Sequence, residues 1–167
     1  MITLYGNSIS PYVRKVLAVL KLKNIDFEQI QQMPYSDDPE YRKINPLGKI
    51  PALIDGDLTI CDSTVICEYL EQAYPQSPVY PEDVPSKTKT RWLVQFAGTS
   101  ITDCAAGIFF QRVMRPMFLK QETDEELVEN IITEKLPPLL DYLETQIPSE
   151  GFLFKSCFSC CYCLSLV

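Results

Sequence analysis

The chain has 167 residues, and its hydrophobic content of 46% is enough for a real core in one domain or two small ones. Its net charge of −7 argues against binding to nucleic acid backbones or to anionic membranes. Histidine is absent, which excludes serine–histidine–aspartate and cysteine–histidine catalysis and any imidazole metal site. The N-terminus lacks a secretory signal pattern, and no internal stretch reaches the roughly 18 apolar residues of a membrane span. We therefore expect a cytoplasmic protein that binds neither membrane nor nucleic acid.

The first eighty residues alternate between strand and helix patterns. Residues 2–5 form a β-prone run closed by a Gly-Asn turn, and residues 11–23 carry apolar side chains at helical spacing with a basic last turn. A second strand is expected over residues 25–30, followed by a polar loop, QQMPYSDDPEYRK, over residues 31–43.

Two further β-prone runs, residues 51–54 and 58–60, are separated by Asp-Gly-Asp, which predicts a hairpin. Asp62 then caps a helix with an apolar inward face. This order of elements predicts an α/β unit in which helices cover a mixed sheet.

Beyond residue 74 the sequence predicts a change of architecture. Four prolines within residues 75–85 indicate a stiff connector at a domain boundary. A long helix is expected over residues 87–115, and Pro116 should end or kink it.

A second helix of this half is predicted by a capping box formed by Thr123 and Glu126. Pro137 and Pro138 should bend or interrupt this helix. The second half is therefore expected to be all-α.

Three short motifs carry the candidate chemistry, and the first is Ser10-Pro11 in NSISPYVRKVL. Serine is a preferred N-cap and proline is favoured at the first helical position, so the pair is fully explained as a helix start. The alternative is that the Ser10 hydroxyl is aimed at a ligand.

The second motif is NPLGKIPAL, residues 45–53. A cis bond between Ile50 and Pro51 would turn the Ile50 backbone outward, where it can pair with a peptide-like ligand. The alternative is an ordinary proline on an edge strand.

The third motif, CDSTVICEYL, opens a helix at Asp62 and Ser63. Free N–H groups and the positive end of the helix dipole favour a carboxylate there, and Asp62 can hold an amine beside it. An amino-acid head group carries both charges, although a simple helix cap would use the same residues.

In this order and at these separations, the three motifs resemble the glutathione S-transferase family, in its cytosolic, serine-type, bacterial-like form, over roughly residues 1–154. The resemblance implies an α/β thioredoxin-like N-terminal domain followed by an all-α domain. The implied organisation is a glutathione-binding domain at residues 1–74, a linker at 75–86, a partial helical domain at 87–154 and an aberrant Cys-rich tail at 155–167.

The resemblance also implies roles for individual residues. Ser10 would donate a hydrogen bond to the glutathione sulfur, Ile50 before a cis Pro51 would pair with the cysteinyl part, and Asp62 and Ser63 would hold the γ-glutamyl group. Lys49 would reach a glutathione carboxylate. The implied co-substrate is glutathione without a metal, the second substrate is a small electrophile, and the implied assembly is a homodimer.

Three functions fit these expectations. The first is a glutathione transferase. Related proteins can carry a cysteine at the position of Ser10, and a serine there favours transfer over disulfide exchange on the enzyme. The second is a glutathione-dependent isomerase that uses the same thiolate. The third is a non-enzymatic binding protein on the same scaffold, of the stringent-starvation-protein type. On the long helix, Arg112 and Arg115 are interpreted as surface residues in preference to substrate contacts.

The tail KSCFSCCYCLSLV departs from the family pattern at Lys155. A zinc site and a membrane anchor are both less favoured than an aberrant tail that replaces the rest of the helical domain. The apolar faces of the two helices would then lose partners, and we expect poor solubility. The side chains concerned are Phe96, Ile101, Ile108, Leu136 and Leu140.

Overall fold

The computed structural model describes residues 1–146, which divide into two compact units. The first unit is Met1–Pro81, and the second begins at Glu82. The expectations for residues 155–167, including the zinc, anchor and aberrant-tail interpretations, lie outside the described residues.

The first unit is built on a four-stranded mixed sheet with strand order β2-β1-β3-β4. β1 pairs in parallel with β2 and antiparallel with β3, and β3 pairs antiparallel with β4. The predicted hairpin is therefore confirmed as β3 and β4. The strands are β1 (Ile2–Tyr5), β2 (Phe27–Ile30), β3 (Ala52–Asp55) and β4 (Leu58–Cys61).

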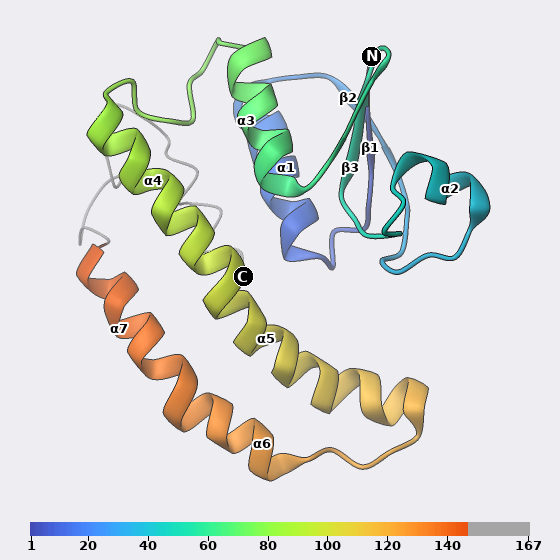
Figure 1. Ribbon diagram of the computed structural model, residues 1–167, viewed down its shortest axis with the longest axis vertical. Helices are drawn as coiled ribbons and strands as arrows, with labels where there is room; N and C mark the ends of the chain where they lie inside the picture. The colour runs from blue at the N-terminus through green and yellow to red at the C-terminus, as the bar shows by residue number, and fades with distance from the viewer. Residues whose placement is uncertain (147–167) are drawn as a thin grey trace. The chain divides into compact units, whose positions relative to one another are not determined.

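Helices cover both faces of this sheet (Figure 1). α1 (Pro11–Leu22) and α3 (Ser63–Ala73) lie side by side on one face, and α2 (Pro39–Ile44) lies on the other. Apolar residues at helical spacing make the inward faces of α1 and α3, which pack against each other, and α3 also contacts β3 and β4. The fully buried core side chains include Leu4, Val13, Val16, Val19, Leu20, Leu53, Ile66 and Leu70. The predicted α/β architecture is confirmed.

The helix α2 corrects the expected loop over residues 31–43. Asp38 caps it by accepting a hydrogen bond from the Glu40 backbone N–H, and Pro39 occupies its first turn. A helix of six residues is too short to show a hydrophobic period, so only the Asp-Pro-Glu start signal was present in the sequence.

A buried ion pair joins the C-terminal ends of α1 and α3. Lys23, only 1% exposed, places its Nζ 2.7 Å from Oε2 of Glu71. The Glu71 carboxylate also accepts the backbone N–H groups of Val79 and Tyr80. Lys23 further donates to the carbonyl oxygens of Tyr74, Gln76 and Ser77. We call this set the Lys23–Glu71 anchor.

The anchor holds part of the expected connector within the first unit. The sequence places the linker at residues 75–86, yet Val79 and Tyr80 are buried in the structure, and the first unit extends to Pro81. The helix of the second unit begins three residues later, at Val84.

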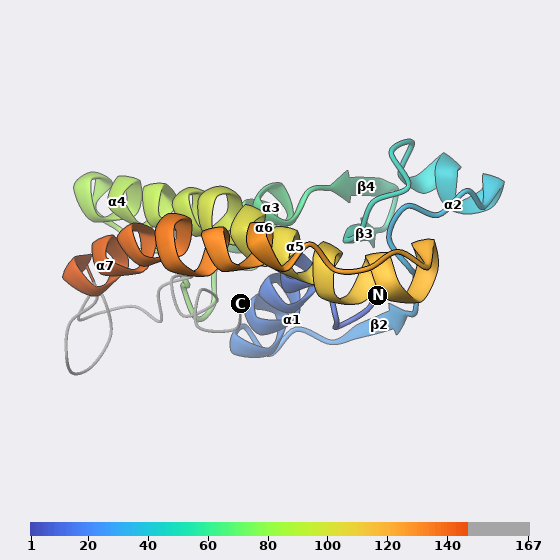
Figure 2. The ribbon, with the colours of Figure 1, turned by 90° about the horizontal axis from the view of Figure 1, so that it is seen from below.

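The second unit consists of two antiparallel helical arms (Figures 1 and 2). Each arm contains π-helical segments, labelled η, in which the backbone hydrogen bonds span five residues. The first arm is α4 (Val84–Phe96), η1 (Ala97–Ile101), α5 (Thr102–Phe109) and η2 (Phe110–Leu119). The second arm is α6 (Glu125–Asn130), η3 (Ile131–Lys135) and α7 (Leu136–Gln146).

Pro116 does not end the first arm, so of the two expected alternatives, an end or a kink, the end is wrong. Pro116 lies inside η2, and the first arm ends at Leu119, where Lys120 takes a left-handed φ of 52°. In the second arm the π-helical segment η3 ends at Lys135, and the chain continues from Leu136 as α7, which contains Pro137 and Pro138.

The start of the second arm also differs from the predicted capping box. Asp124 is the N-cap, accepting the backbone N–H of Leu127 at 3.0 Å. The Thr123 hydroxyl instead donates to the Gln111 carbonyl in η2 at 3.1 Å, so it ties the two arms together.

The arms pack through a small core. Leu93, Ala97, Ile101 and Leu143 are buried, with Phe96, Leu136, Leu139 and Tyr142 packed against them. Of the side chains expected to lose their partners, Ile101 is therefore buried, whereas Leu140 is exposed. Trp92 donates its indole N–H to the Tyr142 hydroxyl at 2.9 Å across the arms. Large exposed apolar side chains include Phe109, Phe110, Met117, Phe118 and Leu119.

Within residues 1–146, the helix Val84–Leu119 is long and apolar enough to cross a membrane. Its 36 residues contain an 18-residue window with a mean hydropathy of 1.3. The core helix of a globular protein passes the same test. This finding differs from the sequence expectation that no stretch reaches the roughly 18 apolar residues of a membrane span, because a mean hydropathy admits polar residues such as Gln95 and Thr99 of this helix.

Candidate functional site

The sheet brings the three sequence motifs to one end of the first unit. Tyr5 of β1 is paired with Ala52 of β3, and Ala52 is paired with Cys61 of β4. These three residues form one row across the sheet. Along the chain, residues 6–10 come directly after β1, residues 49–51 directly before β3, and residues 62–63 directly after β4. All three predicted segments therefore leave the sheet at the same end, next to the N-termini of α1 and α3.

Ser10 occupies the N-cap position of α1, as predicted, with φ −72° and ψ 126°. Its side chain makes no capping hydrogen bond, and only its carbonyl joins the helix, by accepting the Arg14 N–H at 3.0 Å. Pro11 occupies the first turn of the helix. The half-exposed Ser10 hydroxyl is therefore not used as a cap.

The loop that carries Ser10 is held by two side chains. Asn7 Oδ1 accepts the Ile9 backbone N–H at 2.9 Å. From the first turns of α1, Arg14 reaches back to the carbonyl oxygens of Ser8 and Ile9 at 3.4 Å each. These contacts fix the course of the chain from β1 to Ser10.

The peptide bond between Ile50 and Pro51 is cis, as predicted. The pair lies just before the paired residues of β3, which is a central strand between β1 and β4. The alternative of an ordinary edge-strand proline is therefore wrong. Ile50 and Pro51 are buried, while the Lys49 side chain is exposed.

Asp62 is the N-cap of α3, also as predicted. Its Oδ1 accepts the backbone N–H groups of Thr64 at 2.8 Å and Val65 at 3.2 Å. Its φ of 93° is rarely adopted by residues other than glycine, and such conformations cluster at binding sites. Ser63 follows as the first helical residue and is buried.

The two helix N-termini are joined by a buried lysine. Lys15 of α1 donates from Nζ to the Thr64 hydroxyl in the first turn of α3 at 2.9 Å. This contact holds the segment with Asp62 and Ser63 against the helix that begins after Ser10.

Gly48 is a required residue of the second motif that sequence reasoning missed. Its φ is +64°, and a Cβ there would lie 2.5 Å from the Ser36 carbonyl oxygen and 2.9 Å from Cζ of Arg42. Arg42 cannot move freely, because it donates to the carbonyl oxygens of Ser36 and Pro46. The signal that would have found it is Asn45-Pro46-Leu47-Gly48, a turn sequence whose Asn45 carbonyl accepts the Gly48 N–H at 2.8 Å.

We expect Gly48→Ala to lower the free energy of unfolding by about 2–3 kcal/mol, since a left-handed alanine costs about 1–2 kcal/mol and the backbone clash adds to it. Urea unfolding measures the change. Gly56→Ala is the matched control, because Gly56 has φ +59° and a Cβ added there would have no neighbouring atom within 4 Å. Equal losses in the two variants would show that the Ser36 contact is not restrictive.

Two ionisable groups lie beside this end of the sheet. Burial raises the pKa of the Cys61 thiol, and Cys61 donates to the Ile44 carbonyl at 3.4 Å, so the thiol stays protonated. Burial is also the main reason that the pKa of Tyr41 is raised to about 12. Neither group is therefore a base at neutral pH. Among the described residues no cluster of cysteine and acidic side chains is placed to hold a metal ion.

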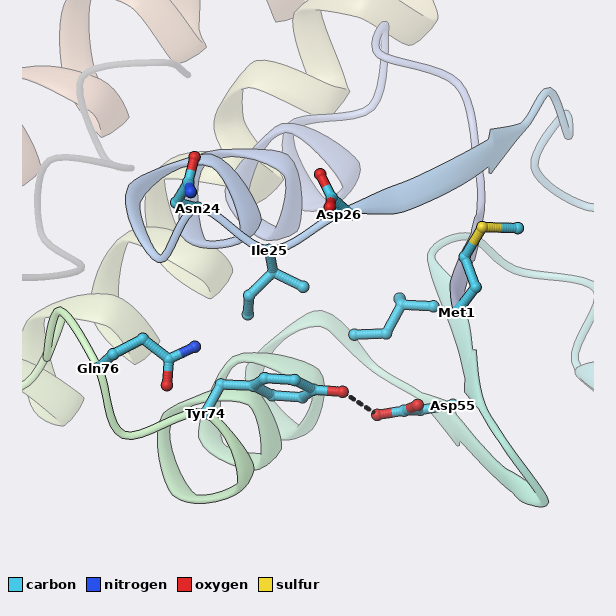
Figure 3. Close-up of a pocket in the computed structure, with 8 residues that line it drawn as sticks. Met1, Asn24, Ile25, Asp26, Asp55, Tyr74 and Gln76 are labelled. Atoms are coloured by element: carbon cyan, nitrogen blue, oxygen red, sulfur yellow. Dashed lines mark hydrogen bonds between the residues drawn. The ribbon is translucent and has the colours of Figure 1, made fainter.

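A pocket of about 270 Å³ lies at the opposite end of the sheet (Figure 3). Tyr74 points its hydroxyl at Asp55, which accepts it at 2.6 Å, and this hydrogen bond raises the pKa of Tyr74 to about 12. None of the predicted site residues lines this pocket. Its lining is Met1, Ile2, Asn24, Ile25, Asp26, Asp55, Tyr74 and Gln76.

Comparison with known families shows which domain the first unit resembles. Residues 4–78 match the family described as glutathione S-transferase, N-terminal domain. The first unit is therefore similar to the N-terminal domain of glutathione S-transferases. The thioredoxin-like sheet followed by a helical unit is the architecture of solved glutathione S-transferases.

Individual proteins similar to this chain are also named glutathione transferases. A glutathione S-transferase of Triticum aestivum is 46% identical over 84 residues, covering 50% of this chain and 39% of that protein. One of Hyoscyamus muticus is 28% identical over 162 residues, covering 93% and 75%. The structure of poplar glutathione transferase F1 is 28% identical with a TM-score of 0.81, covering 99% of this chain and 78% of that one.

The match with the wheat glutathione S-transferase thus spans less than half of that relative. The two curated relatives compared here are plant proteins, and the serine-type and bacterial-like assignments stay predictions. In the second unit, Arg112 forms an exposed ion pair with Glu125 at 3.0 Å, in agreement with the surface interpretation.

Proposed function

We propose that the chain binds reduced glutathione at the sheet end defined by Tyr5, Ala52 and Cys61 and activates its thiol for transfer to small electrophiles. The observation that carries this proposal is the convergence of the Ser10, Lys49–Pro51 and Asp62–Ser63 segments along one row of the sheet. The match of residues 4–78 with the glutathione S-transferase N-terminal domain supports glutathione as the co-substrate.

Ser10 supplies the activating group. A thiol with an ordinary pKa of about 8.5 is mostly protonated at neutral pH, and a hydrogen bond donated to the thiolate lowers that pKa. The Ser10 hydroxyl is spared from capping α1, and the helix N-terminus favours negative charge beside it. This route needs no general base, which is consistent with a chain that has no histidine.

The remaining groups hold the tripeptide. Asp62 uses Oδ1 for both capping bonds, which leaves Oδ2 to accept from the γ-glutamyl ammonium group. The N-terminus of α3 at Ser63 receives the neighbouring carboxylate. Ile50 pairs through its backbone with the cysteinyl part, and the exposed Lys49 ammonium reaches another carboxylate.

The wider assignment rests on the similarity to glutathione S-transferases. We propose a cytoplasmic homodimer that takes a small electrophile as its second substrate. The thiolate site would equally support glutathione-dependent isomerisation.

The first experiment is a calorimetric titration of the purified chain with reduced glutathione. Saturable binding with one site per chain is expected. A chain that is folded by circular dichroism yet shows no saturable binding would contradict the proposal and favour a non-enzymatic binding protein on this scaffold.

The variant Asp62→Asn sharpens this experiment. Asparagine keeps the capping oxygen and tolerates positive φ, so α3 is retained while the negative charge is lost. Its affinity for glutathione should fall about 10- to 150-fold, in line with about 1.5–3 kcal/mol for a charged hydrogen bond. Asp57→Asn, in the exposed hairpin turn at the other end of the sheet, is the charge-matched control.

A further inference from the structure

Two buried side chains of the α2 segment converge on one backbone oxygen beside the proposed glutathione site. The Tyr41 hydroxyl donates to the Lys49 carbonyl at 2.6 Å, and Nδ2 of Asn45 donates to the same oxygen at 2.7 Å. Tyr41 and Asn45 are 2% and 3% exposed. Water therefore cannot readily replace either donor.

The Lys49 carbonyl belongs to the peptide group that also carries the Ile50 N–H. A trans peptide group is planar and rigid, and its C=O and N–H point in opposite directions. Two donors that draw the carbonyl toward α2 therefore direct the Ile50 N–H away from α2. The neighbouring cis bond to Pro51 leaves Ile50 between two defined peptide planes.

The donors are themselves held in place. Asn45 Oδ1 accepts the Leu47 N–H at 3.0 Å, and the Asn45 carbonyl accepts the Gly48 N–H at 2.8 Å. The Tyr41 ring packs on Tyr5 of β1 with ring centroids 5.9 Å apart. Because burial keeps the pKa of Tyr41 well above neutrality, its hydroxyl remains a donor.

We infer that Tyr41 and Asn45 are positioning residues for glutathione, which fix the Lys49–Ile50 peptide group so that the Ile50 backbone meets the cysteinyl part in the correct orientation. This inference rests on the proposed function. It goes beyond it by assigning a role to two residues that do not contact the ligand.

Tyr41→Phe tests the inference, because it removes a single oxygen atom. Tyr69→Phe is the matched control: its hydroxyl donates to Asp55 at 2.8 Å, at the far end of the sheet. Calorimetry should show a three- to tenfold loss of glutathione affinity in Tyr41→Phe and no change in Tyr69→Phe, in line with the loss of one hydrogen bond.

Amide hydrogen exchange adds a readout that a purely structural role would leave unchanged. Bound glutathione should slow exchange of the Ile50 N–H in the wild-type chain, and this protection should be reduced in Tyr41→Phe while that of Ser63 is kept. Should Tyr41→Phe fail to fold, Asn45→Asp provides the same comparison, since it keeps the acceptor for Leu47 and loses the donor to Lys49.

The outcomes separate the two proposals. Failure of the folded wild-type chain to bind glutathione overturns the proposed function. Wild-type binding together with unchanged affinity and unchanged Ile50 protection in Tyr41→Phe overturns the positioning role alone. Equal affinity losses in Tyr41→Phe and Tyr69→Phe also overturn it.

Discussion

In the Ser10→Ala variant, the pKa of the thiol of bound glutathione should rise by about one to two pH units. A hydrogen bond to a charged group contributes about 1.5–3 kcal/mol, and 1.36 kcal/mol corresponds to one pH unit. The donor stabilises the thiolate, so its loss favours the protonated thiol and raises the pKa. The ultraviolet absorbance of the thiolate, followed against pH at saturating glutathione, measures the change without requiring an electrophile.

The control for this experiment is Ser8→Ala. Ser8 lies in the same loop and is exposed, and Arg14 contacts its backbone carbonyl, which alanine retains. Ser8→Ala should therefore leave the pKa of the bound thiol unchanged. If Ser10→Ala also left it unchanged, Ser10 would only mark the start of α1.

Lys23→Met should lower the free energy of unfolding by about 3–5 kcal/mol, the usual cost of removing one partner of a buried ion pair. Methionine fills most of the volume but leaves the Glu71 carboxylate without its cation. It also leaves the Tyr74 carbonyl without this donor. Urea unfolding followed by circular dichroism gives the midpoint and its slope.

Lys43→Met is the matched control for the anchor. Lys43 pairs with Glu40 at 2.7 Å on the exposed surface of α2, and such pairs contribute about 0.2–0.5 kcal/mol. The two variants make the same chemical change in buried and exposed settings. Coincident urea midpoints would mean that the Lys23–Glu71 anchor adds little to stability.

Local signals predicted the parts of the structure that local chemistry determines. Asp62 caps α3 because an N-cap acts on N–H groups two and three residues away, and the Asp-Gly hairpin likewise depends on adjacent residues. The cis bond before Pro51 was also predicted from its motif. These features needed no knowledge of the rest of the fold.

Features that depend on distant partners were not predictable in the same way. In the sequence, Tyr41 lies in an expected loop and Lys23 at the end of an expected helix. Their partners become evident only when α2 packs beside Lys49 and α3 packs beside α1. The sequence predicted Thr123 as a helix cap. In the structure its hydroxyl donates to the Gln111 carbonyl of the other arm, and Asp124 is the N-cap. Sequence patterns indicate which local hydrogen bonds a side chain can make, whereas packing between segments determines which one it makes.

The Lys23–Glu71 anchor also determines where this gene could be recombined with others. A chimaera joined at residue 74 would lose the N–H groups of Val79 and Tyr80 that Glu71 accepts. It would also lose the carbonyl oxygens of Gln76 and Ser77 to which Lys23 donates. A junction after Pro81 keeps the whole set on one side. The portable module of this chain therefore includes most of its proline-rich stretch, and chimaeras with a different helical half should be joined beyond it.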